Sequence, residues 1–223
     1  MARIYFLFDA SAASHYYIDF DPYKDILTIL FAKRAEGKAF FYLPTFCVAE
    51  TFNIFAKYHY RRMTIDGDTY RKAFDTFAEH IHDRKVFYCY DLNRYHNLNL
   101  NWRKVYEIEH KTDTEYERLG INPKTTSDRE AKRLYHQRFP DSSLGRHYLS
   151  GFDLLILGMA IELMRNLGEK VYLVTRDERL VKIAQLVEVA EPGTEKPHKL
   201  KVINLGNTGC LNQVKSIFGL PIR

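Results

Sequence analysis

Four acidic residues that lie far apart in the sequence occupy positions typical of a shared catalytic site. Asp9 directly follows the apolar run RIYFLF, and Asp177 comes two residues after the apolar run KVYLVT. Asp153 lies at the start of the apolar segment FDLLILGMAIELM, and Glu50 lies within FCVAETFNIFAKYHYRR. Carboxylate and water oxygens are the ligands that Mg²⁺ and Mn²⁺ prefer, and a bound cation can activate water against a phosphodiester. If the fold gathers these acids, they predict a divalent-cation site with hydrolytic chemistry.

Each acid also has a structural interpretation. Asp is a favoured N-cap, so Asp9, Asp153 and Asp177 could each only accept hydrogen bonds from the first amides of a helix. Glu50 differs, because its helical neighbours one turn away on either side are apolar. A carboxylate buried on such a face needs a partner, and no Lys or Arg lies one turn away. A divalent cation would serve as that partner and would gather the other acids around it.

Two hydroxyl side chains stand beside these acids. Ser11 lies two residues after Asp9, and Thr175 lies two residues before Asp177. Their hydroxyl groups could orient a carboxylate or a metal-bound water. A local turn stabilised by the hydroxyl is the alternative interpretation.

The elements that must position these side chains alternate along the chain. Mostly apolar runs, as in strands covered on both faces, predict five strands at RIYFLF, AFFYL, KVFYCY, KVYLVT and KLKVINL. Helical patterns lie between them, over residues 46–62, 68–83, 152–168 and 177–187. Alternating strands and helices predict an α/β fold with a mainly parallel sheet of about five strands. Because ligands bind at the carboxyl edge of such sheets, we expect Asp9 and Asp177 on that edge and Glu50 and Asp153 in helices beside it.

The middle of the chain differs from the rest. Residues 93–149 contain no convincing strand, and their charged residues have helical periodicity. We therefore expect a single domain over residues 1–223, with a helical insertion at about 93–149.

Composition narrows the class of protein. The net charge of +5 and the isoelectric point near 8.9 are compatible with a polyanionic partner, although they favour one only weakly. The three cysteines are far apart and odd in number, which excludes a disulfide framework and predicts a cytoplasmic protein. No signal peptide or membrane span is expected, because charged residues interrupt the apolar runs. The nine histidines show no zinc-ligand spacing.

Two basic stretches with interleaved aromatic residues are candidates for RNA binding. KYHYRR covers residues 57–62, and REAKRLYHQR covers residues 129–138. Cations can bind phosphates while Tyr and His stack on bases, although a solvated helix face is the alternative. The cations expected to bind nucleic acid are Lys57, Arg61, Arg62, Arg129, Lys132, Arg133 and Arg146.

The order of these motifs resembles that of the PIN domain, a family that includes VapC-type toxins and RNA-processing nucleases. The resemblance rests on a strand followed by D-A-S, then P-T-F-C-V-A-E-T-F-N, F-D-L-L-I-L-G-M-A and V-Y-L-V-T-R-D-E-R-L. It covers about residues 3–60 and 150–205 and leaves the insertion outside. The resemblance implies a three-layer α/β/α sandwich and a Mg²⁺- or Mn²⁺-dependent endoribonuclease. It also implies that Asp9, Glu50 and Asp153 are metal ligands and that Asp177 completes the acidic pocket.

Other interpretations remain open. The PIN-like fold could serve as a non-catalytic RNA-binding or assembly module, or the chain could be a toxin controlled by an antitoxin-like protein. The long separation of Glu50 from Asp153 argues against a compact toxin more than against the chemistry. A homodimer through the aromatic-rich insertion is also expected, with candidate contacts at Tyr106, Tyr116, Tyr135 and Tyr148. A haloacid dehalogenase-type phosphotransferase would need a second Asp at position 11, and a dinucleotide-binding fold would need a Gly-rich motif that is missing.

Overall fold

A computed structural model describes residues 3–18, 23–82, 84–92, 149–189 and 198–222, with a few isolated positions between 105 and 134. The expected insertion at 93–149 lies almost entirely outside the described residues, as do the four tyrosines expected at a dimer contact.

The centre of the molecule is a five-stranded sheet in which every neighbouring pair is parallel. The strand order is β3-β2-β1-β4-β7. The bounds are β1 Ile4–Phe8, β2 Ala39–Pro44, β3 Phe87–Tyr90, β4 Val171–Thr175 and β7 Lys201–Asn204. This confirms the α/β class and the five strands expected from the apolar runs.

The last expected strand is divided in two. The run KLKVINL forms the end of β6 (His198–Lys199) and all of β7, with the buried Leu200 between them. The amide of Leu200 donates to the carbonyl of Val187, 3.1 Å away, rather than to the central sheet. β6 therefore pairs antiparallel with β5 (Glu188–Val189) in a small second sheet.

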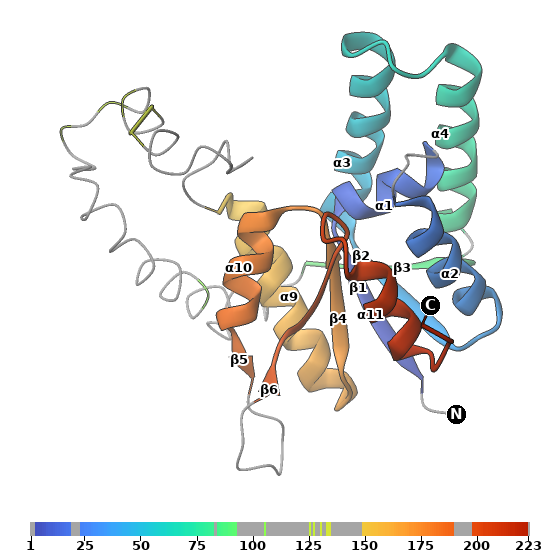
Figure 1. Ribbon diagram of the computed structural model, residues 1–223. Helices are drawn as coiled ribbons and strands as arrows, with labels where there is room; N and C mark the ends of the chain where they lie inside the picture. Colours follow the sequence, from blue (N-terminus) through green and yellow to red (C-terminus); the bar gives the residue numbers. More distant parts are fainter. Residues whose placement is uncertain are drawn as a thin grey trace.

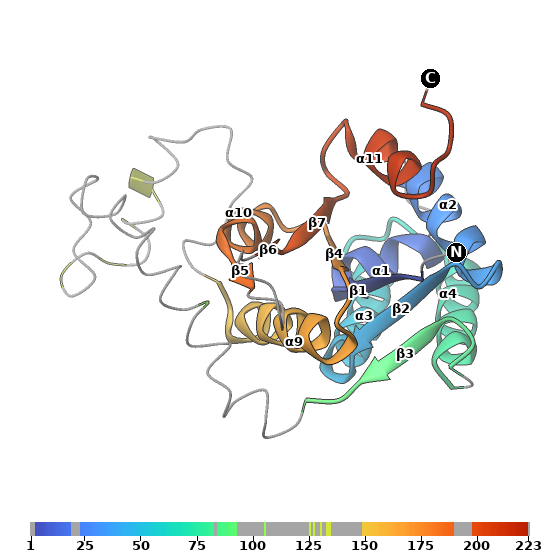
Figure 2. The same ribbon diagram turned by 90° about the horizontal axis from the view of Figure 1, so that it is seen from below.

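Helices cover both faces of the central sheet, as the three-layer expectation requires. In Figure 2, α2 (Lys24–Ala35), α4 (Gly67–His82) and α11 (Cys210–Ile217) lie on one side. On the other side lie α9 (Gly151–Leu167) and α10 (Glu178–Leu186). This division follows from right-handed crossovers, because the chain crosses from β1 toward β3 in one direction and from β4 toward β7 in the other.

Aromatic side chains fill the layer between the sheet and α2. Phe8 of β1 packs against Phe41 of β2, with 4.7 Å between ring centres, and against Phe87 of β3 at 5.4 Å. Phe31 of α2 contacts all three rings. These rings are buried, so they form part of the hydrophobic core and are not available to stack on bases.

Helices α3 (Thr45–Ala56) and α4 form a hairpin that extends beyond the carboxyl edge of the sheet (Figure 1). The helix expected over 46–62 is α-helical only to Ala56, and its last turn is the π-helical segment η1 (Lys57–Arg61). Met63, with φ of 50°, ends this turn before α4 begins. The basic stretch KYHYRR therefore lies at the tip of the hairpin.

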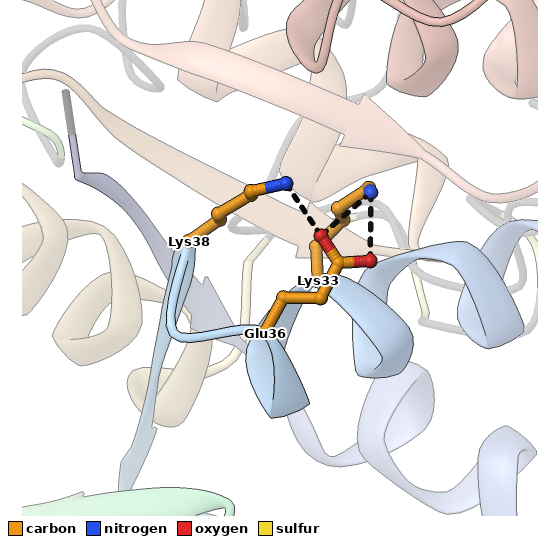
Figure 3. A network of polar contacts seen from close by, with 3 residues as sticks. All are labelled: Lys33, Glu36 and Lys38. Atoms are coloured by element: carbon orange, nitrogen blue, oxygen red, sulfur yellow. Dashed lines mark hydrogen bonds and ion pairs between the residues drawn. The ribbon is translucent and has the colours of Figure 1, made fainter. Parts of the chain in front are cut away.

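A small ion-pair network joins the end of α2 to the start of β2 (Figure 3). Glu36 lies 2.9 Å from Lys33 Nζ and 2.7 Å from Lys38 Nζ. Hydrogen bonds from the two ammonium groups lower the pKa of Glu36. Because the network is exposed, it contributes little to stability.

Candidate functional site

The candidate site lies where β1 and β4 end side by side. From β1 the chain crosses toward β2, whereas from β4 it crosses toward β7 on the other side. In open parallel sheets, such a reversal of strand order leaves a crevice at the carboxyl edge in which ligands bind. Asp9 is the first residue after β1, and Thr175 is the last residue of β4.

Asp9 is buried at this point, with only 6% of its surface exposed. Its side chain caps α1 (Ala10–Tyr17) by accepting a 2.7 Å hydrogen bond from the amide of Ala12. The hydroxyl groups of Ser11 and Thr175 donate to the same carboxylate, at 2.9 Å and 2.5 Å. Both hydroxyl residues thus orient the Asp9 carboxylate, and Ser11 and Thr175 are correctly placed by the D-A-S and T-R-D patterns.

Burial gives this carboxylate an unusual proton affinity. Removal from water raises the pKa of Asp9 to about 7, and the negative charge of Asp177 adds to the increase. The three hydrogen-bond donors act in the opposite direction but do not cancel the effect of burial. Asp9 therefore has a raised pKa in the metal-free protein, and a nearby cation would favour its ionised form.

Asp177 is the N-cap of α10. Its Oδ1 accepts hydrogen bonds from the amides of Arg179 and Leu180, at 2.8 Å and 3.0 Å. The amide of Asp177 in turn donates to the hydroxyl group of Thr175 at 3.0 Å. Asp9, Thr175 and Asp177 therefore form one continuous chain of polar contacts across the ends of β1 and β4.

Asp153 belongs to a capping box at the start of α9. Ser150 is the N-cap, and its hydroxyl group accepts from the amide of Asp153 at 3.2 Å. Asp153 Oδ2 accepts from the amide and the hydroxyl group of Ser150, at 2.9 Å and 2.7 Å. Asp9 and Asp177 are thus N-caps, as the structural interpretation predicts, whereas Asp153 lies three residues after the N-cap Ser150 and completes the capping box.

Glu50 corrects one expectation from the sequence. The side chain lies on α3 but is exposed, so it is not a carboxylate buried among apolar residues. Its neighbours Phe46 and Ile54 are only half-buried, so the face that they share is not the core of the domain. The burial argument for a cation beside Glu50 is therefore wrong, and any role for Glu50 must rest on its proximity to the other acids.

The buried thiol of Cys47 shows that proximity. Burial raises the pKa of Cys47, and the negative charges of Asp9, Glu50 and Asp153 raise it further. The charges of Asp9, Glu50 and Asp153 therefore all act on the thiol of Cys47, and the charge of Asp177 acts on Asp9. The four acids that the sequence singled out thus lie in one electrostatic environment, and their joint binding of a cation stays a prediction.

These donors suit Mg²⁺ or Mn²⁺ in type, although their present arrangement is not a closed cage. Within the described ranges, no three His, Cys, Asp or Glu side chains already converge at ligand distances. Mg²⁺ commonly keeps several waters and binds proteins directly through only one or two carboxylates, so a closed cage is not required. The raised pKa of buried Asp9 beside Asp177 fits a cation, because a positive charge would compensate the burial of the carboxylate. Asp9, Glu50, Asp153 and Asp177 are the residues that would hold it.

Arg176 and His15, two residues near this cluster, were not predicted from the sequence to belong to a site. Arg176 Nη1 lies 3.4 Å from His15 Nε2, and the guanidinium carbon lies 5.5 Å from the ring centre of Tyr23. Burial and the Arg176 charge lower the pKa of His15 to about 4, so the neutral imidazole can accept from Arg176. Arg176 is exposed and could bind a phosphate. An arginine in T-R-D has no distinctive spacing, so only the fold reveals its neighbours.

The basic stretches are not gathered at the acids. Lys57, Arg61 and Arg62 are exposed near the tip of the α3–α4 hairpin, and Arg61 lies about 15 Å along the helix from Glu50. Arg62 packs over the ring of Tyr58 at 4.8 Å. Arg133 is exposed, whereas Arg129, Lys132 and Arg146 lie outside the described residues. RNA contacts by these cations stay predictions.

An aromatic pair connects the two helices that carry Glu50 and Asp153. Phe46 of α3 stacks on Phe152 of α9, with 5.2 Å between ring centres and 28° between ring planes. Phe46 precedes Glu50 by one helical turn, and Phe152 directly precedes Asp153. The pair therefore lies at the rim of the acidic cluster.

Two comparisons with known proteins were made at the level of sequence. The sequence matches no protein-family model and no curated protein. In the part of the chain that the structure describes, no helix has both the length and the apolar character needed to cross a membrane.

Proposed function

We propose that this protein is a metal-dependent nuclease of the PIN type, acting as an endoribonuclease. The observation that carries the proposal is the buried Asp9 carboxylate, which lies beside Asp177 where β1 and β4 end and shares its surroundings with Glu50 and Asp153. Helix capping explains the three aspartates one at a time, but it does not explain why the charges of Asp9, Glu50 and Asp153 all act on the thiol of Cys47.

Each side chain has a distinct part in this proposal. Asp9, Glu50 and Asp153 are metal ligands, and Asp177 binds directly or through water. Ser11 and Thr175 hold the Asp9 carboxylate in one orientation through their hydrogen bonds. A bound Mg²⁺ or Mn²⁺ ion would supply charge neutralisation for the phosphodiester and activation of water.

The acids also explain why a cation is needed for substrate binding. Four carboxylates at one edge repel a phosphodiester, so RNA is expected to approach this edge only after their charge is compensated. Lys57, Arg61, Arg62 and Arg176 supply additional positive charge on neighbouring surfaces, which would attract the rest of the RNA backbone.

The experiment measures cleavage of a mixed-sequence RNA by the purified chain in Mg²⁺, in Mn²⁺ and in EDTA, together with Asp9→Asn and Asp153→Asn variants. We expect metal-dependent cleavage that both variants lose. A Lys33→Ala variant, altered in the distant ion-pair network, is the matched control and should retain full activity. Cleavage that persists in Asp9→Asn would assign the activity to a contaminant or to another site.

The second candidate is a non-catalytic RNA-binding or assembly module with the same fold. It is favoured by the capping bonds, because these give all three aspartates a structural purpose. RNA binding that needs no metal, without cleavage under any condition, would support this candidate. Three further proposals remain: control by an antitoxin-like protein, an activity in the cytoplasm and a homodimer. Co-purification would test the protein partner, and a mass measurement in solution would test the homodimer.

A further inference from the structure

The stacked pair Phe46–Phe152 has one member whose exposure the fold does not explain. Phe152 exposes 57% of its surface, although a phenylalanine gains free energy when it is buried. Its packing against half-buried Phe46 holds one ring face and leaves much of the side chain open to solvent. A rigid, flat and exposed aromatic surface is the kind of feature on which an unpaired nucleobase stacks.

The position of the pair connects it to the acidic cluster. Phe152 is adjacent to Asp153 in the first turn of α9, and Phe46 lies one turn from Glu50 on α3. A base on Phe152 would therefore belong to a nucleotide at or next to the phosphate that the acids address. The uncharged ring also offers favourable contact on an edge where carboxylates repel the phosphate backbone.

We propose that Phe152, supported by Phe46, is a stacking platform for one unpaired base of a single-stranded RNA substrate. The inference rests on the proposed nuclease and assigns Phe152 as a residue that binds its substrate. A single exposed ring suits a base better than a protein partner, because stable protein interfaces bury about 800 Å² on each side. Bases within a duplex are already stacked on their neighbours, so the platform selects single-stranded segments.

The test measures binding without cleavage, in the Asp9→Asn background with Mg²⁺ present. Fluorescence anisotropy with a short labelled single-stranded RNA gives the Kd of the Asp9→Asn protein and that of the same protein with the additional Phe152→Ala substitution. We expect Phe152→Ala to weaken binding by about 5- to 100-fold, whereas Phe152→Tyr and Phe152→Trp retain it. Leu186→Ala, which alters another exposed apolar residue at the end of α10, is the control and should leave Kd unchanged.

A second measurement separates base stacking from every other contact. A series of the same RNA, each with one base removed but the backbone intact, is bound to both proteins. Removal of the base at one position should weaken binding to the protein that has Phe152. Removal of the same base should have no effect on binding to Phe152→Ala. In addition, Phe152→Trp in a Trp102→Phe background should show fluorescence quenching when the RNA binds. Equal Kd values for Phe152 and Phe152→Ala, or equal effects of base removal in both, would overturn the platform.

The two proposals fail in different ways. If the wild-type chain cleaves RNA but Phe152→Ala binds normally, the nuclease stands and the platform is wrong. If base removal acts through Phe152 but no cleavage occurs with either metal, the platform stands as part of a binding module. A duplex of the same sequence that binds as tightly as the single strand would contradict the expected substrate class.

Discussion

The hydroxyl group of Thr175 donates a 2.5 Å hydrogen bond to Asp9 Oδ2, which joins the end of β4 to the end of β1. The same hydroxyl accepts a hydrogen bond from the amide of Asp177. Thr175 thus connects two acids that are 168 positions apart in the sequence. Thr175 is completely buried, so its hydroxyl group contacts the carboxylate and not the solvent.

Replacing Thr175 with valine should raise the pKa of Asp9 further, because the valine has the same shape but cannot donate to the carboxylate. The free energy of unfolding should fall by about 1–3 kcal/mol, since buried polar groups lose a partner. Urea unfolding and the pH dependence of metal binding measure both effects. Thr175→Ser keeps the hydroxyl group and should remain close to the wild type, whereas an equal loss in both variants would point to packing alone.

The metal-free protein should become less stable as the pH rises through the range in which Asp9 titrates. The pKa of Asp9 is about 7 in the folded state and 3.8 in the unfolded reference, so between these values the folded state binds more protons. The free energy of unfolding therefore falls from about pH 4 to about pH 7, by at most about 1.4 kcal/mol per pH unit from this group.

The same range contains an opposite contribution from His15, whose pKa is lowered to about 4 by burial and by Arg176. Unfolding in EDTA must therefore be compared between the wild type and Asp9→Asn at each pH. If Asp9 is responsible, the free energy of unfolding of the wild type minus that of Asp9→Asn should decrease with rising pH. A difference that does not change with pH would show that burial of Asp9 does not shift its pKa.

Capping and catalysis can be separated at Asp153 and Asp177. Asn is about as good an N-cap as Asp at position 177, and the amide oxygen of Asn at position 153 can still accept from Ser150, so Asp153→Asn and Asp177→Asn should unfold within about 1 kcal/mol of the wild type. Both should lose metal-dependent cleavage, because the charge is gone. Ser150→Ala gives the reverse result: it removes the cap at a cost of about 1 kcal/mol but keeps the carboxylate, so cleavage per folded molecule should persist.

Glu50→Gln should be the cleanest test of the acidic cluster. Glu50 is exposed and caps no helix, so the free energy of unfolding should change by less than about 0.5 kcal/mol. Metal binding measured by calorimetry should nevertheless weaken, and cleavage should fall by at least about tenfold. Glu79→Gln, on the exposed surface of α4, is the matched control. Unchanged metal binding in Glu50→Gln would remove Glu50 from the ligand set.

The cysteines should differ in reactivity in the folded protein. Burial and three neighbouring carboxylates raise the pKa of Cys47, and burial alone raises that of Cys210 to about 12. Cys89 is only half-buried. Alkylation at pH 8 followed by mass spectrometry should therefore modify Cys89 first, and all three thiols only after unfolding. Rapid modification of Cys47 in the folded state would contradict its burial among the acids.

The parallel α/β architecture could be predicted from the amino-acid sequence, because mostly apolar runs alternate with helical patterns along most of the chain. The placement of Asp9, Asp153 and Asp177 at the starts of helices could be predicted as well, since short polar residues before apolar helices are strong capping signals. The αL conformation of Gly168, which ends α9 with φ of 62°, is similarly local, because glycine adopts it without the steric cost of a side chain.

Which of these local features contact one another depends on the packing of the whole chain and could not be predicted. The contact between Thr175 and Asp9 depends on β1 and β4 being neighbours, a pairing between strands that no local pattern specifies. The exposure of Glu50 depends on which face of α3 packs against α1, and apolar neighbours one turn away could not reveal it. The stacking of Phe46 on Phe152 requires α3 and α9 to begin at the same edge of the sheet. Local signals are set by a few adjacent residues, whereas burial and long-range contacts depend on the packing of the whole chain.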